Sequence, residues 1–308
     1  MSEPVVPVIL NPTSRSGGAR QHQEAVVRDL ATRGITAQLH LTQSAAHATA
    51  LGRELATSNS LVVAAGGDGT VHDVANGILQ SGAAATCGFA VLPLGTGNDF
   101  AKVVPGAENR QSALDVIAQP RFVSYDVGLA EWPGGREFFI NGMGTGIDVE
   151  VVRQLHRLPA LPGPVKYLLG LFRALAIYQP VRVTAVLNGE RLDRSVMMMA
   201  VGNGICQGGG FYLTPEASPR DGRLDLCVVA KLPLWKVALV LPRVLRGTHG
   251  GHPLVTMRSL EKVRFEANER SPLYFQLDGE LRQPSDAFWL DVTVQPGALR
   301  VATSQEVK

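Results

Sequence analysis

Gly66-Gly67-Asp68-Gly69-Thr70 follows directly after the apolar run Leu61-Val62-Val63-Ala64-Ala65. This order predicts a buried strand that enters a glycine turn and then a helix from Val71. We expect the glycines to let the backbone approach a charged ligand and adopt positive φ angles without a steric penalty. The free N–H groups at the start of such a helix suit a phosphate. Because the Asp68 carboxylate would repel that phosphate, it predicts a cation that bridges the two.

The composition is that of a folded protein with room for two domains. The chain has 308 residues, of which 45% are hydrophobic and 18% charged. A net charge of +2 without a run of Lys and Arg does not indicate a nucleic-acid partner. Cys87, Cys206 and Cys227 are far apart and predict small core residues in a reducing compartment. The chain shows neither the pattern of a signal peptide nor a membrane-spanning stretch, so we expect a cytoplasmic protein.

The first third of the sequence alternates between strand-like and helix-like segments. Apolar runs predict strands at residues 5–10, 35–41, 61–65 and 89–92, and helices are predicted at 19–33 and after an N-cap at Ser44. Strict alternation of this kind predicts a parallel sheet covered by helices on both faces. Ligands of such sheets bind beyond the carboxyl ends of the strands.

From about Arg121 onward the pattern becomes that of an antiparallel β region. Residues 181–186 alternate with period two and precede Asn188-Gly189, which predicts a hairpin turn. Further strands are predicted at 196–201, 224–229, 263–267, 273–277 and 288–294, with helices only at 147–157, 166–178 and 234–246. We therefore predict an α/β domain over residues 1–125 and a mainly antiparallel β domain over residues 126–294.

Two more loops follow strands of the predicted parallel sheet. Residues 93–100 read PLGTGNDF and again combine glycines, a hydroxyl and a carboxylate, whereas residues 11–18 read NPTSRSGG and bring Arg15. Because the carboxyl ends of parallel strands meet at one edge, the three loops together predict a site for a nucleoside triphosphate and Mg²⁺.

These motifs resemble those of the bacterial diacylglycerol kinase-like lipid kinases. The resemblance covers GGDGT, PLGTGNDFA, the opening NPTSRSGG and LDGE at 277–280, together with VGNG at 201–204, GGG at 208–210, TPEA at 214–217 and DGRLD at 221–225. GGDG alone is shared by a superfamily that includes NAD kinases, whereas GTGNDFA and the GGG-to-LD run are typical of the lipid branch. The resemblance implies a three-layer, doubly wound Rossmann-like nucleotide domain and a β-sandwich domain for lipid. It also implies that residues 295–308 return to the first domain.

Site residues follow from the same resemblance. It implies Glu280 as the general base, with Asp278 beside it, and an acidic set of Asp68, Asp99 and Asp126 around the catalytic Mg²⁺. ATP would be bound by Asn11, Pro12, Thr13, Ser14, Arg15, Thr42, Gly66, Gly67, Asp68, Gly69, Thr70, Val71, His72, Gly95, Thr96 and Asn98. A second, structural Mg²⁺ would be bound by Asp221 and the carbonyl groups of Ser218 and Arg223. The pair Arg15-Ser16 departs from the usual family pattern and leaves open which basic residue contacts the phosphate.

Structural interpretations of the same residues remain open. Asp278-Gly279 and Asp221-Gly222 are ordinary turn dipeptides, and Asp126 could cap the end of a strand. His249-Gly250-Gly251-His252 has no third ligand nearby and predicts a mobile loop.

The sequence leaves the substrate and the partners open. Diacylglycerol, phosphatidylglycerol and a sphingoid base all fit an apolar cleft, and a soluble substrate of the NAD kinase type or a catalytically silent regulator are the alternatives. The helix at 166–178 has Leu168, Leu171, Phe172 and Leu175 on one face, and the helix at 234–246 carries Trp235, Leu239 and basic residues. Both could contact the inner surface of the membrane, but packing against the β region is the favoured interpretation. The oligomeric state is open, and a dimer is one option.

Overall fold

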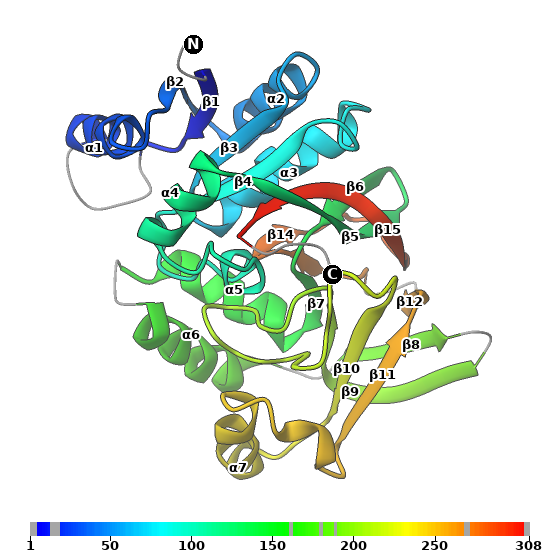
Figure 1. Cartoon of the computed structure of the whole chain (residues 1–308). Coiled ribbons are helices and arrows are strands. Elements are labelled where there is room, and N and C mark those ends of the chain that lie inside the picture. Colours follow the sequence, from blue (N-terminus) through cyan, green and yellow to red (C-terminus); the bar gives the residue numbers. More distant parts are fainter. Residues whose placement is uncertain are drawn as a thin grey trace. The chain divides into compact units, whose positions relative to one another are not determined.

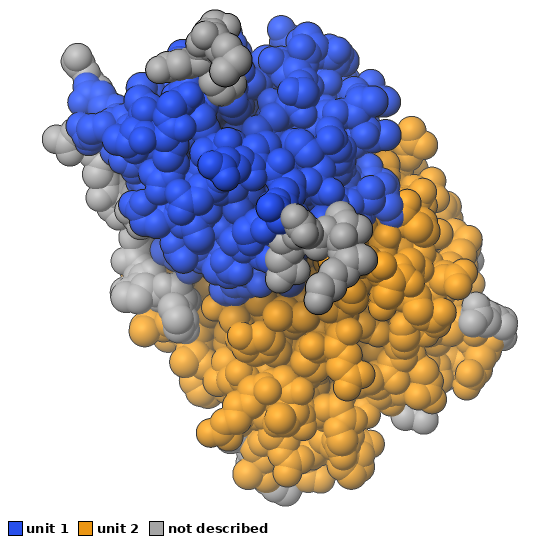
Figure 2. All heavy atoms as spheres, in the orientation of Figure 1, with its two compact units in different colours: residues 1–125, 297–308 blue, residues 126–296 orange. Residues whose placement is uncertain are grey.

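A computed structural model describes residues 5–12, 19–159, 163–178, 181–187, 190–267 and 272–304. The chain divides into two compact units (Figure 2): unit 1 comprises residues 1–125 and 297–308, and unit 2 comprises residues 126–296. Each unit contains its own group of paired strands and its own buried hydrophobic residues.

Unit 1 contains a parallel sheet with the strand order β2-β1-β3-β4-β15. The strands are β1 (Val5–Leu10), β2 (Thr36–Leu41), β3 (Leu61–Gly66), β4 (Gly88–Pro93) and the C-terminal part of β15 (Trp289–Thr303), in which Val301 pairs with Phe89. β3 and β4 are buried along their whole length because helices cover both faces. The order reverses between β1 and β3, and this topological switch point is where α/β sheets bind ligands.

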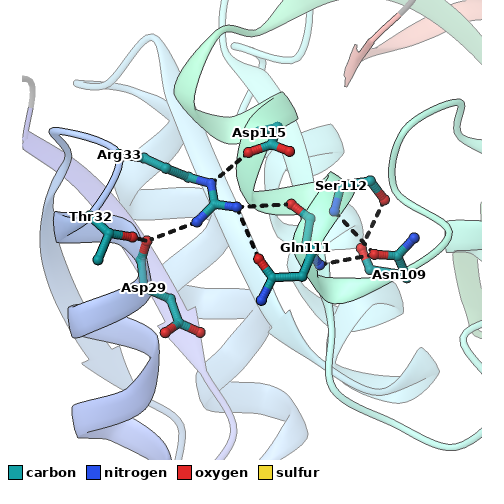
Figure 3. A network of polar contacts seen from close by, with 7 residues as sticks. All are labelled: Asp29, Thr32, Arg33, Asn109, Gln111, Ser112 and Asp115. Atoms are coloured by element: carbon teal, nitrogen blue, oxygen red, sulfur yellow. Dashed lines mark hydrogen bonds and ion pairs between the residues drawn. The ribbon is translucent and has the colours of Figure 1, made fainter.

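Helices connect these strands: α1 (Ala19–Ala31), α2 (Ala45–Ala56), α3 (Asp68–Gln80) and α4 (Arg110–Ala118), with a 3₁₀ turn η1 (Phe100–Val103) after β4. Ser44 caps α2, as predicted, by accepting the N–H of His47 at 3.1 Å. α1 and α4 lie on the same side of the sheet (Figure 1). Arg33, just after α1, donates to Asp115 at 2.7 Å and to the Gln111 side chain at 3.0 Å, which ties the two helices together (Figure 3).

Unit 2 contains an antiparallel sheet with the order β14-β13-β7-β9-β8-β12-β15. β10 pairs with β9 and β11, and β5 forms a hairpin with β6. The strands not yet given are β5 (Arg121–Trp132), β6 (Gly135–Phe139), β7 (Gly142–Gly146), β8 (Val181–Leu187), β9 (Glu190–Gly202), β10 (Leu224–Ala230), β11 (Val255–Leu260), β12 (Lys262–Ala267), β13 (Phe275–Leu277) and β14 (Glu280–Arg282). One buried cluster, which includes Phe139, Phe265 and Phe275, fills the interior of these strands.

A second buried cluster in unit 2 lies beneath its helices α5 (Ile147–Arg157), α6 (Gly163–Ile177) and α7 (Leu234–Val244). Tyr167 and Ala174 of α6 and Val240 and Val244 of α7 belong to it. Among the described residues, no helix combines the length and the apolar character needed to cross a membrane. The fold is thus an α/β unit and a unit of the β-sandwich kind, as the sequence predicts.

Several elements differ from the sequence-based expectation. The helix after β3 begins at Asp68 and not at Val71. β7 was not predicted, because its sequence GMGTG is poor in strand-forming residues. Its glycines are there because side chains press against the strand: a Cβ on Gly144 would lie 1.8 Å from Oδ2 of Asp148. In place of the expected mobile loop, the chain forms a 3₁₀ turn, η2 (His249–Gly251), in which His249 is fully buried and its Nε2 lies 3.1 Å from the Leu213 carbonyl oxygen.

Candidate active site

The turn between β3 and α3 presents the start of a helix at the switch point of unit 1. Gly67 is the N-cap of α3, and the N–H of Val71 already donates to the Gly67 carbonyl at 3.1 Å. The free N–H groups are therefore those of the first helical residues, Asp68 to Thr70. Their partial positive charge suits an anionic group.

The turn at 66–70 requires glycine for a reason other than the expected positive φ angles. None of Gly66, Gly67 and Gly69 has a positive φ angle, which corrects that expectation. The cause is crowding: a Cβ on Gly95 would lie 2.6 Å from Cα of Gly67, and a Cβ on Gly66 would lie 2.6 Å from the Thr70 side chain. Two loops are in backbone contact here, and only glycine allows it.

Asp68 holds the second loop through both of its carboxylate oxygens. Oδ2 accepts the N–H of Asn98 at 2.8 Å, and Oδ1 accepts the N–H of Asp99 at 2.6 Å. Asn98 has a φ of 51° and exchanges two hydrogen bonds with the backbone of Gly95, at 2.9 and 3.0 Å. The loop at 95–99 is thereby locked against the turn at 66–70.

Asp68 and Asp99 carry two carboxylates, and the cation Lys102 lies beside them. This excess of acidic groups makes this part of unit 1 suitable for a bound cation. Burial, and then the charge of Asp99, raise the pKa of Asp68 to about 6. Asp99 is buried and pairs with Nζ of Lys102 at 2.7 Å. No group of three or more acidic, His or Cys side chains with metal-site spacing occurs among the described residues. A pair of carboxylates nevertheless fits Mg²⁺, which commonly takes one or two carboxylates and completes its shell with phosphate oxygens and water.

The structure brings Asn11 and Thr42 to the same edge of the sheet. The backbone N–H of Asn11 donates to the Ala65 carbonyl at 3.1 Å, and its side chain donates to Oγ1 of Thr70 at 3.2 Å. The backbone N–H of Thr42 donates to the Leu10 carbonyl at 3.0 Å. Gly95 and Thr96 lie in the neighbouring loop, where Thr96 is exposed. Pro12 adjoins Asn11, whereas Thr13, Ser14 and Arg15 lie outside the described residues.

Two of the predicted nucleotide residues are buried in unit 1. Val71 and His72 have 4% and 1% of their surface exposed, and the His72 carbonyl accepts a hydrogen bond from the Asn76 side chain at 3.1 Å. Their side chains therefore serve packing of α3.

In unit 2, Asp278 and Gly279 form the two-residue turn between β13 and β14. Both have positive φ angles, 49° and 91°, as a type I′ hairpin turn requires. The Asp278 carboxylate accepts the backbone N–H groups of Ile140, Asn141 and Gly142 at 2.8 to 2.9 Å. All these contacts are structural, so the geometry gives Asp278 the role of anchoring the turn.

Glu280 is the first residue after this turn, opposite Leu277 in the β13–β14 ladder. It is half-buried, and among the described residues no hydrogen bond or ion pair engages its side chain. Arg282, two residues further, forms a two-pronged ion pair with Glu137 of β6, with one Nε–Oε2 distance of 2.7 Å. Glu280 is thus a carboxylate with open acceptor positions on a well-anchored hairpin.

Asp126 and the predicted structural metal site lie together in unit 2. Asp126 accepts the Gly222 N–H at 2.7 Å and donates its own N–H to the Pro219 carbonyl at 2.7 Å, so it holds the loop that contains Ser218, Asp221 and Arg223. Asp221 accepts the Arg223 N–H at 3.0 Å. Burial and the nearby Asp221 raise the pKa of Asp225. This excess of negative charge fits a cation, with carbonyl groups as the remaining ligands.

Sequence reasoning missed a buried polar cluster behind the Glu280 turn. Gln276 donates to Asp148 at 2.8 Å and accepts the Gly279 N–H at 2.6 Å. Both side chains are buried. The glycines of β7 were the one available signal, because glycine within a strand often marks a close approach by another group.

Family models match both halves of the chain. The diacylglycerol kinase catalytic domain matches residues 5–130, and the YegS C-terminal NAD kinase beta sandwich-like domain matches residues 141–303.

Individual relatives agree with these matches. The chain is 29% identical over 277 residues to a diacylglycerol kinase of Bacillus subtilis (strain 168), with 89% of this chain and 88% of the relative covered. It is 32% identical over 249 residues to a YegS-like lipid kinase of Chromohalobacter salexigens, with 79% and 76% covered. A crystal structure of a diacylglycerol kinase from Bacillus anthracis str. Sterne superposes with a TM-score of 0.70 over 98% of this chain and 97% of that one, at 19% identity. The chain therefore belongs to the diacylglycerol kinase-like family of lipid kinases.

Proposed function

We propose that this kinase transfers the γ-phosphoryl group of ATP to the hydroxyl group of a diacylglycerol-like lipid, with Mg²⁺ and with Glu280 as the general base. Unit 1 is assigned to the nucleotide and unit 2 to the lipid. The observation that carries the proposal is Glu280, an acid with open acceptor positions on an anchored turn. Phosphatidylglycerol and a sphingoid base are the other acceptors to be tested.

The loops of unit 1 support the binding of a polyphosphate. The helix start at Asp68 to Thr70, the Thr96 hydroxyl and Asn11 lie around one edge of the sheet. Mg²⁺ held by Asp68 and Asp99 would neutralise phosphate charge, which is most of what a protein contributes to phosphoryl transfer. The interlocked loops keep these groups in place before the nucleotide arrives.

The proposed reaction needs one proton acceptor. The O–H bond of the lipid breaks and its proton passes to the Glu280 carboxylate, while the hydroxyl oxygen forms the new bond to phosphorus. The bond between the γ-phosphorus and its bridging oxygen breaks, and its electrons leave with ADP. Asp278 and Gly279 serve this step by fixing the backbone that carries Glu280.

The substitution Glu280→Gln tests the base assignment. Glutamine keeps the size of the side chain but cannot take the proton, so kcat should fall at least about a hundredfold. ATP affinity, measured by titration calorimetry, should stay within about twofold because the nucleotide residues lie in unit 1. Glu266→Gln is the matched control: it removes a carboxylate of unit 2 that pairs with Arg191, and its rate should be unchanged. A wild-type rate in Glu280→Gln would refute the assignment.

The acceptor can be identified by ATP consumption with mixed micelles of diacylglycerol, phosphatidylglycerol or sphingosine, and with NAD as a soluble control. A yeast NADH kinase superposes with a TM-score of 0.53 at 10% identity, a likeness of fold alone. Phosphorylation of NAD and of no lipid would replace the proposed acceptor with a soluble one. The names of the relatives favour diacylglycerol.

We also infer that the exposed residues of α6 and α7 contact anionic membranes. Leu168, Leu171 and Leu175 pack on the helix-covered core, as expected, but Phe172 does not and is 61% exposed. Val165 and Leu169 share its side of α6, and Leu239 of α7 is also exposed. The only charged residues of the two helices are Lys166, Arg173, Lys236 and Arg243. An exposed apolar stripe with purely basic charge suits an anionic lipid surface.

A further inference from the structure

Asp148 is a buried carboxylate for which the proposed chemistry has no use. It lies in the first turn of α5, with 5% of its surface exposed, and its hydrogen-bond partner is the uncharged amide of Gln276 at 2.8 Å. Burial raises the pKa of Asp148, and the opposing effect of the Gln276 hydrogen bond is smaller, so the pKa lies above its ordinary value. Among the described residues no cation pairs with Asp148, and burying an acid without one is costly, so its position demands a reason.

The start of α5 does not supply that reason. An acid in the first turn is favourable to a helix, but it has this effect when exposed as well. Glu150, in the same turn, shows the ordinary arrangement, since it pairs with the cation Arg153 and accepts from Gln154 at 2.6 Å. Asp148 instead points at β7, where only Gly144 leaves room for its Oδ2.

The hydrogen bonds of Gln276 connect Asp148 with the Glu280 turn. Nε2 of Gln276 donates to Asp148, and it also donates to Oε1 of Gln207 at 3.2 Å. Its Oε1 is therefore directed to the Gly279 N–H, at 2.6 Å. An amide in the reverse orientation would lose these bonds, since its oxygen would face two acceptors and its NH₂ group a donor. The acceptor at Asp148 thus decides which way the Gln276 amide points.

We propose that Asp148 and Gln276 are positioning residues that hold the Asp278–Gly279 peptide group, one residue before Glu280, and thereby aim the Glu280 carboxylate. This inference rests on the proposed role of Glu280. Asp278 anchors one side of the turn to the start of β7, and the Asp148–Gln276 pair anchors the other side at Gly279. Neither positioning residue takes the proton itself.

Steady-state kinetics of Gln276→Leu and Gln154→Leu test the proposal. The two glutamines are a matched pair, because each is buried and donates Nε2 to a carboxylate, but only Gln276 reaches the turn. Gln276→Leu should lower kcat at least about tenfold while KM for ATP stays within about twofold, since small displacements of a reacting group are costly. Gln154→Leu should keep kcat within about twofold. Equal kcat values in the two variants would overturn the proposal.

Substitutions of Asp148 separate the role of an acceptor from that of a charge or of packing. Asp148→Asn keeps an acceptor oxygen and should retain kcat within about threefold, whereas Asp148→Leu should behave like Gln276→Leu. A loss in Asp148→Asn as large as in Asp148→Leu, with melting temperatures equal to that of the wild type, would overturn the proposal.

A double-mutant cycle keeps failure of this inference apart from failure of the proposed function. If Gln276 acts through Glu280, Gln276→Leu should have little further effect on the residual rate of Glu280→Gln. Full additivity of the two losses would overturn the positioning role and leave the base assignment standing. A wild-type rate in Glu280→Gln would refute the base assignment whatever Gln276→Leu does.

Discussion

Asp68 has a structural task in addition to its proposed one. Both of its carboxylate oxygens accept backbone N–H groups of the loop at 98–99, and its neighbour Asp99 already has Lys102 as a partner. Each carboxylate oxygen has two lone pairs, so these bonds leave room for a cation. A sequence motif shows that an acid stands here, but not which of its oxygens are engaged.

The raised pKa of Asp68 predicts a pH dependence of stability. The pKa is about 6 in the folded protein, above the ordinary value of 3.8 for an aspartate, so the fold favours the protonated acid. The contribution of Asp68 to the free energy of unfolding is therefore fully present below about pH 4 and is lost as the pH rises through about 6. Urea midpoints of the wild type and of Asp68→Asn, measured in EDTA from pH 4 to pH 7, check this expectation.

Asp68→Asn removes this titration but keeps an acceptor for the loop. The difference in unfolding free energy, wild type minus variant, should fall with rising pH, because only the wild type must bury a charge. Carboxylates that do not interact with Asp68 titrate equally in both proteins and cancel in that difference. A difference that does not change between pH 4 and pH 7 would contradict the raised pKa.

The β13–β14 hairpin is the element on which the proposed base depends. The turn at Asp278-Gly279 has the residue types that a type I′ turn demands, so the hairpin itself could be predicted from the sequence. Its anchoring could not, because the three N–H donors come from residues 140–142, which are more than a hundred positions away in the chain.

Asp278→Ala should destabilise unit 2 by about 2–3 kcal/mol, since three buried N–H groups lose a charged acceptor. The urea midpoint measures this loss. Asp286→Ala is the control, because Asp286 is an exposed acid a few residues further along the chain, and it should change stability by less than about 0.5 kcal/mol. Equal effects of the two substitutions would show that the carboxylate does not anchor the turn.

At the scale of whole elements, the sequence predicts a strand correctly where one hydrophobic pattern extends along the whole element. The strands β1, β3 and β4 are uninterrupted apolar runs, and their bounds differ from the predicted ones by one residue at most. It fails for β7, where the tertiary contacts of Asp148 and Gln207 require glycine and thereby erase the strand pattern. The buried cluster behind Glu280 was missed for the same reason.

For the molecule as a whole, alternation of strands and helices was enough to predict that described residues of the three proposed nucleotide loops meet in unit 1. Parallel strands end at one edge, so Asn11, Asp68 and Asn98 become neighbours although they are spread over almost ninety residues. Antiparallel order is less constrained: β7 pairs with both β9 and β13, and no local pattern selects these partners. Only the family resemblance groups Asp126 with Asp68 and Asp99; in unit 2 its carboxylate accepts the Gly222 N–H and its own N–H donates to the Pro219 carbonyl.

The exposed residues of α6 and α7 predict how the whole protein behaves with membranes. The wild type should bind vesicles of phosphatidylglycerol more tightly than vesicles of phosphatidylcholine, because each basic residue near an anionic surface contributes about 1 kcal/mol. Replacement of Val165, Leu169 and Phe172 by serine should weaken binding to phosphatidylglycerol at least about tenfold, which corresponds to about 1.4 kcal/mol and is less than full burial of one such side chain.

Sedimentation with vesicles measures both effects. Val27 and Leu41 of unit 1 are also exposed, and their replacement by serine provides a control that should bind like the wild type. The melting temperature of the triple variant checks that the fold is kept, since Val165, Leu169 and Phe172 are 53%, 37% and 61% exposed and are thus covered in part. Basic charge and exposed apolar area are the two properties of α6 and α7 that favour a membrane. Binding that does not depend on lipid charge, or that persists in the triple variant, would therefore contradict the inferred membrane contact.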